Sequence, residues 1–203
     1  METALRVWFT NAYFRNVVSR DPSAFIPADF TATAGTCIGG HFSRSKGRGL
    51  LQCYPEARQC LTFLRDPWEV SLSNYFYWRS RNRQFNIDRG VLKPGDYRDY
   101  RDLDDYLSKT SSFLLNYFPE ELTAANYRNM IDKYFVYIGI AEDLQGSADR
   151  LADRLGRKRI EIPHVNVSAR EEQSREKARL SFVARHPLEY EIYNYICDNY
   201  KKV

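Results

Sequence analysis

The chain has 203 residues, of which 43% are hydrophobic and 28% charged, and its formal net charge is +4. This length suits a single domain over residues 1–203 with a real hydrophobic core, and the basic balance suits an anionic ligand. The basic and acidic residues are interspersed and no nucleic-acid-binding motif is visible, which argues against a nucleic-acid partner. The apolar runs are too short for a transmembrane segment. The four cysteines have no CxxC spacing and there are only three histidines, which argues against a bound metal.

Helical and strand patterns alternate along the chain. Apolar residues at helical spacing predict a helix over residues 5–13. We expect the other elements in this order: a loop at 20–33, a strand at 36–42, a basic loop at 43–49, a strand at 61–64, a helix at 67–79, a loop at 84–101, helices at 102–116 and 120–132, a strand at 134–140, and helices at 142–156, 170–185 and 187–200. This alternation predicts an α/β domain with a small parallel sheet flanked by helices.

The most informative stretch of the sequence is the strand, turn and helix around Arg65. The apolar run at residues 61–64 is too short for a helix and matches a buried parallel strand. Pro67 disfavours a helical conformation at Asp66 and suits the first turn of the helix that follows. Arg65 is therefore expected at the carboxyl end of a strand, where open α/β sheets bind ligands.

This Arg-Asp-Pro turn, with Ser73 eight residues and Tyr75 ten residues after Arg65, resembles the 3′-phosphate-binding motif of sulfotransferases. Those enzymes use 3′-phosphoadenosine 5′-phosphosulfate as sulfuryl donor, and the resemblance implies that Arg65 and Ser73 hold the 3′-phosphate of this nucleotide. A planar guanidinium and a hydroxyl are suitable donors to a phosphate. The alternative is an ordinary strand–helix turn in which Arg65 makes a surface salt bridge.

Four further segments extend the resemblance to carbohydrate sulfotransferases of the heparan and chondroitin type. Gly40-His41-Phe42 resembles a Gly-His-Phe segment of that branch, and residues 137–142 resemble a later strand that ends in Gly and an acidic residue. Residues 163–168 resemble a loop that closes over the nucleotide, and residues 188–193 resemble the last helix. The resemblance implies a P-loop-NTPase-like sulfotransferase fold.

His41 is the candidate catalytic residue. Sulfuryl transfer to a hydroxyl requires a base that takes the acceptor proton, and the near-neutral pKa typical of histidine suits that task. The resemblance implies this role for His41, and the preceding glycines permit close approach of a ligand. The alternative is a histidine that caps the strand end and bonds to the backbone.

Further binding residues are implied on three segments. The resemblance implies nucleotide contacts from Asn166 and Ser168, which also spell a glycosylation sequon, and from Arg170, for which a solvated position is an equal alternative. Two basic clusters, one with Arg44, Lys46 and Arg48 and one that begins at Arg79, are candidates for binding an acidic sugar acceptor. Charge clusters of this kind are also common on solvated surface.

The resemblance departs from the family at the N-terminus. The family holds the 5′-phosphosulfate on a first strand and a phosphate-binding loop that leads into a helix. No such strand, glycine-rich loop or lysine precedes the first helix here, and Thr3 falls where the last hydroxyl of that loop would lie. We therefore expect an N-terminally truncated domain whose first strand is missing, with weak or absent transfer.

The leading hypothesis is a sulfotransferase that moves a sulfuryl group from 3′-phosphoadenosine 5′-phosphosulfate to a carbohydrate hydroxyl. The alternative is an inactive, truncated protein that binds a nucleotide, a sugar or only a partner. A nucleotide-binding α/β protein of another chemistry is a third option, without a GxxxxGK[ST] or GxGxxG motif to support it. The acceptor stays open, and so does the compartment, because a bacterial cytoplasmic enzyme and a fragment of a Golgi luminal enzyme fit equally.

Overall fold

The computed structural model describes residues 1–15, 35–80, 100, 102–110, 114–163 and 176–200, and the side chains of residues 15 and 77–80 are outside this description. The strands are β1 (Asn11–Arg15), β2 (Thr36–Gly40), β3 (Cys60–Leu64) and β4 (Phe135–Ile140). The α-helices are α1 (Glu2–Trp8), α2 (Leu50–Cys53), α3 (Pro67–Ser80), α5 (Leu103–Lys109), α6 (Tyr127–Tyr134), α7 (Leu144–Arg154), α8 (Glu176–Arg185) and α9 (Pro187–Tyr200). Short 3-10 turns are η2 (Arg44–Lys46), η3 (Leu114–Tyr117) and η4 (Ala141–Asp143). The predicted α/β class is confirmed.

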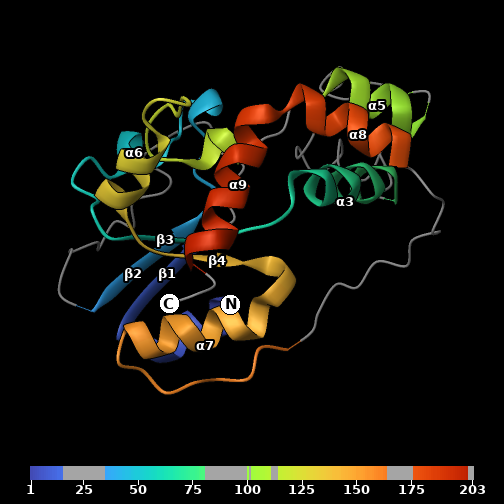
Figure 1. Cartoon of the computed structure of the whole chain (residues 1–203). Coiled ribbons are helices and arrows are strands. Elements are labelled where there is room, and N and C mark those ends of the chain that lie inside the picture. The colour runs from blue at the N-terminus through green and yellow to red at the C-terminus, as the bar shows by residue number, and fades with distance from the viewer. Residues whose placement is uncertain (16–34, 81–99, 101, 111–113, 164–175, 201–203) are drawn as a thin grey trace, which may run out of the picture.

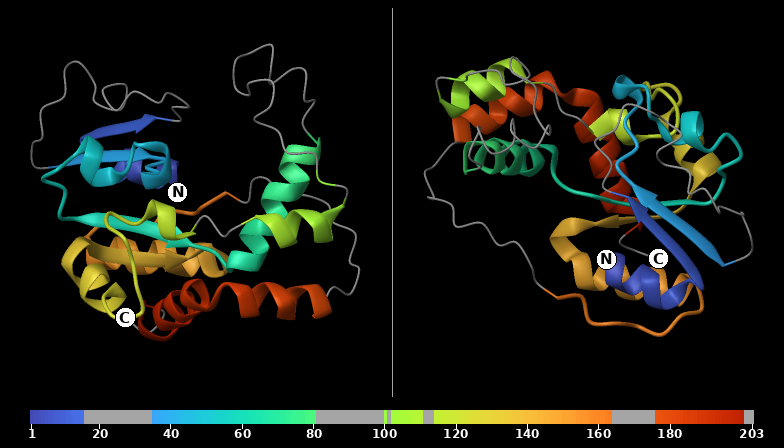
Figure 2. Two further views of the ribbon diagram at one scale, coloured as in Figure 1. Left: turned by 90° about the horizontal axis from the view of Figure 1, so that it is seen from above. Right: turned by 180° about the vertical axis from the view of Figure 1, so that it is seen from behind.

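The described strands form two separate parallel pairs. β1 pairs with β2, with Asn11 beside Thr36, and β3 pairs with β4, with an irregularity between Cys60 and Leu61. All four strands run in broadly the same direction (Figure 2, left). The expectation of parallel strands is therefore confirmed, but the expected single sheet is wrong for the described residues, because β2 and β3 are not paired with each other.

Helices cover the strands on two sides (Figure 1). α1 and α7 lie on one side, and α6 and α9 lie on the other. α3, α5 and α8 form a third group beside the strands, built around Trp68, Tyr106 and the fully buried Phe182. The chain thus has helices on both faces of parallel strands, the layering that a βα-rich chain adopts to bury both faces.

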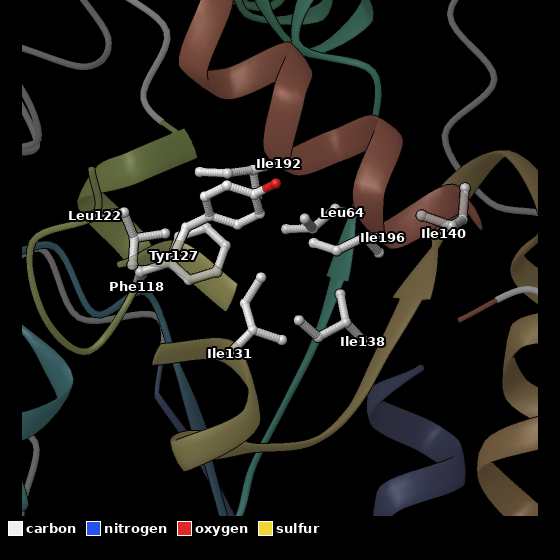
Figure 3. Close-up of a cluster of buried hydrophobic side chains, with 9 residues drawn as sticks. All are labelled: Leu64, Phe118, Leu122, Tyr127, Ile131, Ile138, Ile140, Ile192 and Ile196. Atoms are coloured by element: carbon white, nitrogen blue, oxygen red, sulfur yellow. The ribbon is translucent and has the colours of Figure 1, made fainter. Parts of the chain in front are cut away.

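The side chains of β4 alternate between two cores. Ile138 and Ile140 point into the cluster beneath α9, where Ile192 and Ile196 meet them (Figure 3). Tyr137 and Gly139 lie on the opposite face, against α7. A Cβ on Gly139 would overlap the ring of Phe63 and lie 3.0 Å from the Cβ of Ser147, so only glycine permits this close approach of helix and strand.

The first helix differs from its prediction. α1 ends at Trp8, and Phe9 is extended, with φ −114° and ψ 135°. Ala12 and Tyr13 satisfy helical spacing in the sequence, but they belong to β1, so the predicted helix over residues 5–13 is wrong in its second half. Backbone pairing of β1 with β2 outweighs the local helical pattern, and α1 still packs its apolar side on both strand pairs through Leu5 and Trp8.

The helices predicted at 102–116 and 120–132 are shorter in the structure. α5 ends at Lys109, and Thr110 is extended while its hydroxyl donates to the carbonyl of Tyr106 at 2.7 Å. α6 begins only at Tyr127, after a turn in which the Asn126 side chain accepts from the Thr123 N–H at 2.8 Å. Both polar side chains satisfy backbone groups locally and so favour the end or start of a helix.

Ser147 offers a test of how α7 is held on β4. Its hydroxyl is fully buried, accepts from the N–H of Ile140 at 2.9 Å and donates to the carbonyl of Ile140 at 3.1 Å. We expect Ser147→Ala to lower the free energy of unfolding by about 1–3 kcal/mol, because buried polar groups lose a partner. Urea denaturation measures this, with Ser181→Ala on the exposed side of α8 as a control that changes it by less than about 0.5 kcal/mol. Equal stability of the two variants would contradict the expectation.

Candidate functional site

His41 and Arg65 lie at the carboxyl ends of two neighbouring strands. His41 follows β2 and is exposed, and Arg65 follows β3 and is partly buried. Both line one cavity of about 1540 Å³, together with Val70 and Asn74 of α3. The structure therefore brings together two residues that are 24 positions apart in the sequence, at the edge where parallel α/β proteins bind ligands.

Arg65 is engaged in an ion pair. One guanidinium nitrogen lies 3.1 Å from Oε2 of Glu69 in the first turn of α3, and the two side chains are 38% and 34% exposed. An ion pair this exposed is weak, since water screens it. An incoming phosphate has to compete with one carboxylate for a guanidinium that remains accessible to solvent.

Asp66 has a structural role that the sequence analysis missed. Its carboxylate accepts hydrogen bonds from the N–H of Trp68, from the hydroxyl of Tyr190 and from the guanidinium of Arg179, each at 2.9 Å. Its own N–H donates to Oε1 of Glu142 at 2.8 Å. Asp66 thus caps α3 and ties it to α8, α9 and the end of β4. An Asp before a Pro-initiated helix is an N-cap signal that the sequence does contain.

The phenols near this network resist ionisation. Burial, followed by the hydrogen bond to Asp66, raises the pKa of Tyr190 well above its usual value. Burial, followed by the carboxylate of Glu142, raises the pKa of Tyr193 in the same way. Asp66 and its partner Arg179 already occupy the N-terminus of α3, so an anion at this strand end would be bound by the neighbouring Arg65 instead.

The other predicted nucleotide contacts are not gathered around this cavity. Ser73 is half-buried on α3, and it is not among the described residues that line the cavity, whereas its neighbour Asn74 is. Thr3 is exposed on α1, and the lining from that helix comes from Glu2 and Leu5 instead. Asn166, Ser168 and Arg170 lie outside the described residues.

The basic loop after His41 is less open than its sequence indicates. Arg48 is 6% exposed, and Arg44 donates to the carbonyl of Leu115 at 3.0 Å, which ties η2 to η3. Gly47 has φ 66°, a left-handed conformation that lets the loop turn back between Ser43 and Arg48. Of the three predicted cations only Lys46 is exposed. Arg79 lies in α3, but its side chain is outside what the structure describes.

Three cysteines line the same cavity from different elements: Cys37 on β2, Cys53 on α2 and Cys60 on β3. Burial raises the pKa of the Cys37 and Cys60 thiols to about 11. Burial also raises the pKa of Cys53, and the charge of Arg48 partly opposes it. These thiols are therefore protonated at neutral pH and are poor nucleophiles, and nothing in the spacing of the cysteines predicted this grouping.

The fold and this edge define an α/β protein with a cavity at the carboxyl ends of its strands. No family model, no curated protein and no solved structure matches the chain.

Among the described residues there is no group of three or more His, Cys, Asp or Glu side chains placed to hold a metal ion. The helices of the described ranges are also all too short or too polar to cross a membrane.

Proposed function

We propose that the chain is a sulfotransferase-type protein that binds the 3′-phosphate end of 3′-phosphoadenosine 5′-phosphosulfate and moves its sulfuryl group to a carbohydrate hydroxyl. The observation that carries the proposal is the placement of His41 and Arg65 around one cavity, at the carboxyl ends of β2 and β3. An exposed imidazole and a solvent-accessible guanidinium at one edge supply a base and an anion-binding group.

In the proposed reaction the acceptor oxygen attacks the sulfur atom of the donor. A new sulfur–oxygen bond forms, the bond from sulfur to the 5′-phosphate oxygen breaks, and adenosine 3′,5′-bisphosphate leaves with the electron pair. His41 takes the hydroxyl proton, which makes the oxygen a better nucleophile as the bond forms. Arg65 anchors the 3′-phosphate.

The described residues suit the 3′-phosphate end of the donor better than its sulfate end. Arg58 and Arg65 are the described basic residues of the cavity lining, apart from His41, and they flank β3 at opposite ends. The start of α1 contributes Glu2 to the lining, and its carboxylate is paired with the guanidinium of Arg6 at 2.7 Å, so this pair adds no net positive charge that would attract a sulfate. We therefore expect the affinity for the nucleotide to test the proposed function more directly than the rate of sulfuryl transfer does.

A second candidate function is nucleotide or sugar binding without catalysis. The cavity lining favours it, because Arg65 lines the cavity whereas Thr3, the residue expected at the sulfate end, is not among the described lining residues. A chain that binds adenosine 3′,5′-bisphosphate but transfers no sulfate to any of a panel of polysaccharides would support this candidate over the first.

Binding of adenosine 3′,5′-bisphosphate tests the role of Arg65. We expect the chain to prefer this nucleotide over adenosine 5′-phosphate, and Arg65→Ala to weaken its affinity about tenfold or more, because a charge-assisted hydrogen bond contributes roughly 1.5–3 kcal/mol. Calorimetry measures both affinities. Arg58→Ala, at the other end of β3, is the matched control and leaves the preference intact.

The Glu69→Gln variant distinguishes two roles for Arg65, binding of the 3′-phosphate and a salt bridge with Glu69 alone. If Arg65 binds the 3′-phosphate, removal of the competing carboxylate leaves the affinity unchanged or higher. If Arg65 only pairs with Glu69, neither variant alters nucleotide affinity, and the unaltered chain binds the two nucleotides equally. The second outcome would contradict the proposed function.

A further inference from the structure

The peptide bond that follows Arg65 is held by a side chain from the end of the neighbouring strand. β3 and β4 pair as far as Leu64 and Ile140, the last residues of the two strands (Figure 3). Beyond this pair β3 leads into α3 and β4 leads into η4, so the ladder of backbone hydrogen bonds ends. The N–H of Asp66 then donates to Oε1 of Glu142 at 2.8 Å. A side-chain oxygen thus takes the place of a ladder carbonyl at the turn.

This hydrogen bond acts on Arg65 through the geometry of the backbone. The peptide unit between Arg65 and Asp66 is planar, so the direction of its N–H fixes the plane and with it the dihedral angle ψ of Arg65. The carboxylate of Asp66 is fixed in turn by the N–H of Trp68 and the hydroxyl of Tyr190. The guanidinium is held more weakly, because its ion pair with Glu69 is exposed. The position of the Arg65 side chain therefore depends on its backbone.

We propose that Glu142 is a positioning residue for Arg65, which holds the backbone of the turn so that the guanidinium meets the 3′-phosphate of the nucleotide. The inference rests on the proposed function, because it assigns that phosphate to Arg65. The task requires an oxygen acceptor at position 142 and does not require a negative charge. Glu142 is exposed, so water reaches the N–H of Asp66 when the side chain is removed, and the fold tolerates its loss.

Calorimetry on the complete chain tests the inference with two nucleotides, adenosine 3′,5′-bisphosphate and adenosine 5′-phosphate. We expect Glu142→Ala to weaken the affinity for the bisphosphate about three- to tenfold, because Arg65 is then ordered only on binding. The affinity for adenosine 5′-phosphate should stay the same, since this nucleotide has no 3′-phosphate. Glu142→Gln keeps an oxygen acceptor and should retain the preference of the unaltered chain. Asp149→Ala is the control, because this carboxylate of α7 accepts from Gln145 of the same helix at 2.8 Å.

A double-mutant cycle shows whether Glu142 acts through Arg65. If it does, Glu142→Ala has no further effect on the affinity for the bisphosphate once Arg65→Ala is present. If the two losses multiply instead, Glu142 acts by another route and the inference is wrong.

The two nucleotides separate the failure of this inference from the failure of the proposed function. A preference for the bisphosphate that persists undiminished in Glu142→Ala would overturn the inference alone. An equal loss for both nucleotides would do the same, because it would make Glu142 a general structural residue, and so would a loss in Glu142→Gln as large as in Glu142→Ala. Equal binding of the two nucleotides by the unaltered chain would overturn the proposed function, and this inference with it.

Discussion

Asp66→Ala should lower the free energy of unfolding by about 2–4 kcal/mol, the largest stability effect we expect from a residue of the motif. The substitution removes the cap of α3 and leaves the hydroxyl of Tyr190 and the N–H of Trp68 without their carboxylate acceptor. Arg179 adds little to the loss, because its side chain is 54% exposed and regains water. Urea denaturation followed by circular dichroism measures the change.

Asp102→Ala is the matched control for Asp66. Asp102 caps α5 by accepting from the N–H of Asp105 at 2.8 Å, and it is exposed. Its loss should cost only about 1 kcal/mol, the usual contribution of an N-cap. Asp66→Asn retains an oxygen acceptor for Tyr190 and should fall between the two. Equal destabilisation by Asp66→Ala and Asp102→Ala would show that the contacts of Asp66 with α8 and α9 contribute nothing.

His41→Ala should lower sulfuryl transfer by roughly 10²–10⁴-fold, the contribution of a general base, with little change in affinity for adenosine 3′,5′-bisphosphate. Transfer of label from the donor to a panel of polysaccharides measures the rate, and calorimetry measures the affinity. Glu56→Gln changes another exposed residue of the same cavity lining and serves as the control, with transfer at the rate of the unaltered chain.

The outcomes of this experiment separate three roles for His41. A normal rate in the His41→Ala protein would place the base elsewhere. Loss of nucleotide binding would make His41 a structural residue at the end of β2. No transfer by an unaltered chain that still prefers adenosine 3′,5′-bisphosphate over adenosine 5′-phosphate would favour the binding function over the enzymatic one.

Local patterns in the sequence were enough to predict the elements that carry the site. The apolar run before Arg65 and the Pro at position 67 predicted β3 and the start of α3, and the apolar run at 134–140 predicted β4. The helices expected at 170–185 and 187–200 are confirmed over their described residues as α8 and α9. In each case the local preference and the tertiary environment agree, since these runs are buried against neighbouring elements.

Other features depend on residues that are distant in the sequence. Ala12 and Tyr13 fit a helix locally, but pairing of β1 with β2 makes them a strand. Arg48 belongs to a loop with the composition of solvated surface, yet the fold buries it. A local sequence pattern cannot predict these contacts, because the contacting residues lie far apart along the chain.

By itself, then, the sequence determined the α/β class, the parallel direction of the strands and the position of Arg65 at a strand end. Only the tertiary structure decided that Asp66 bonds to Tyr190, 124 residues later, and that Arg65 pairs with Glu69. It alone decided that the strands form two pairs with an apolar cavity between them. The physical reason is that strand composition reports burial of the faces of a strand, whereas the pairing of its edges is set by backbone groups that every residue shares.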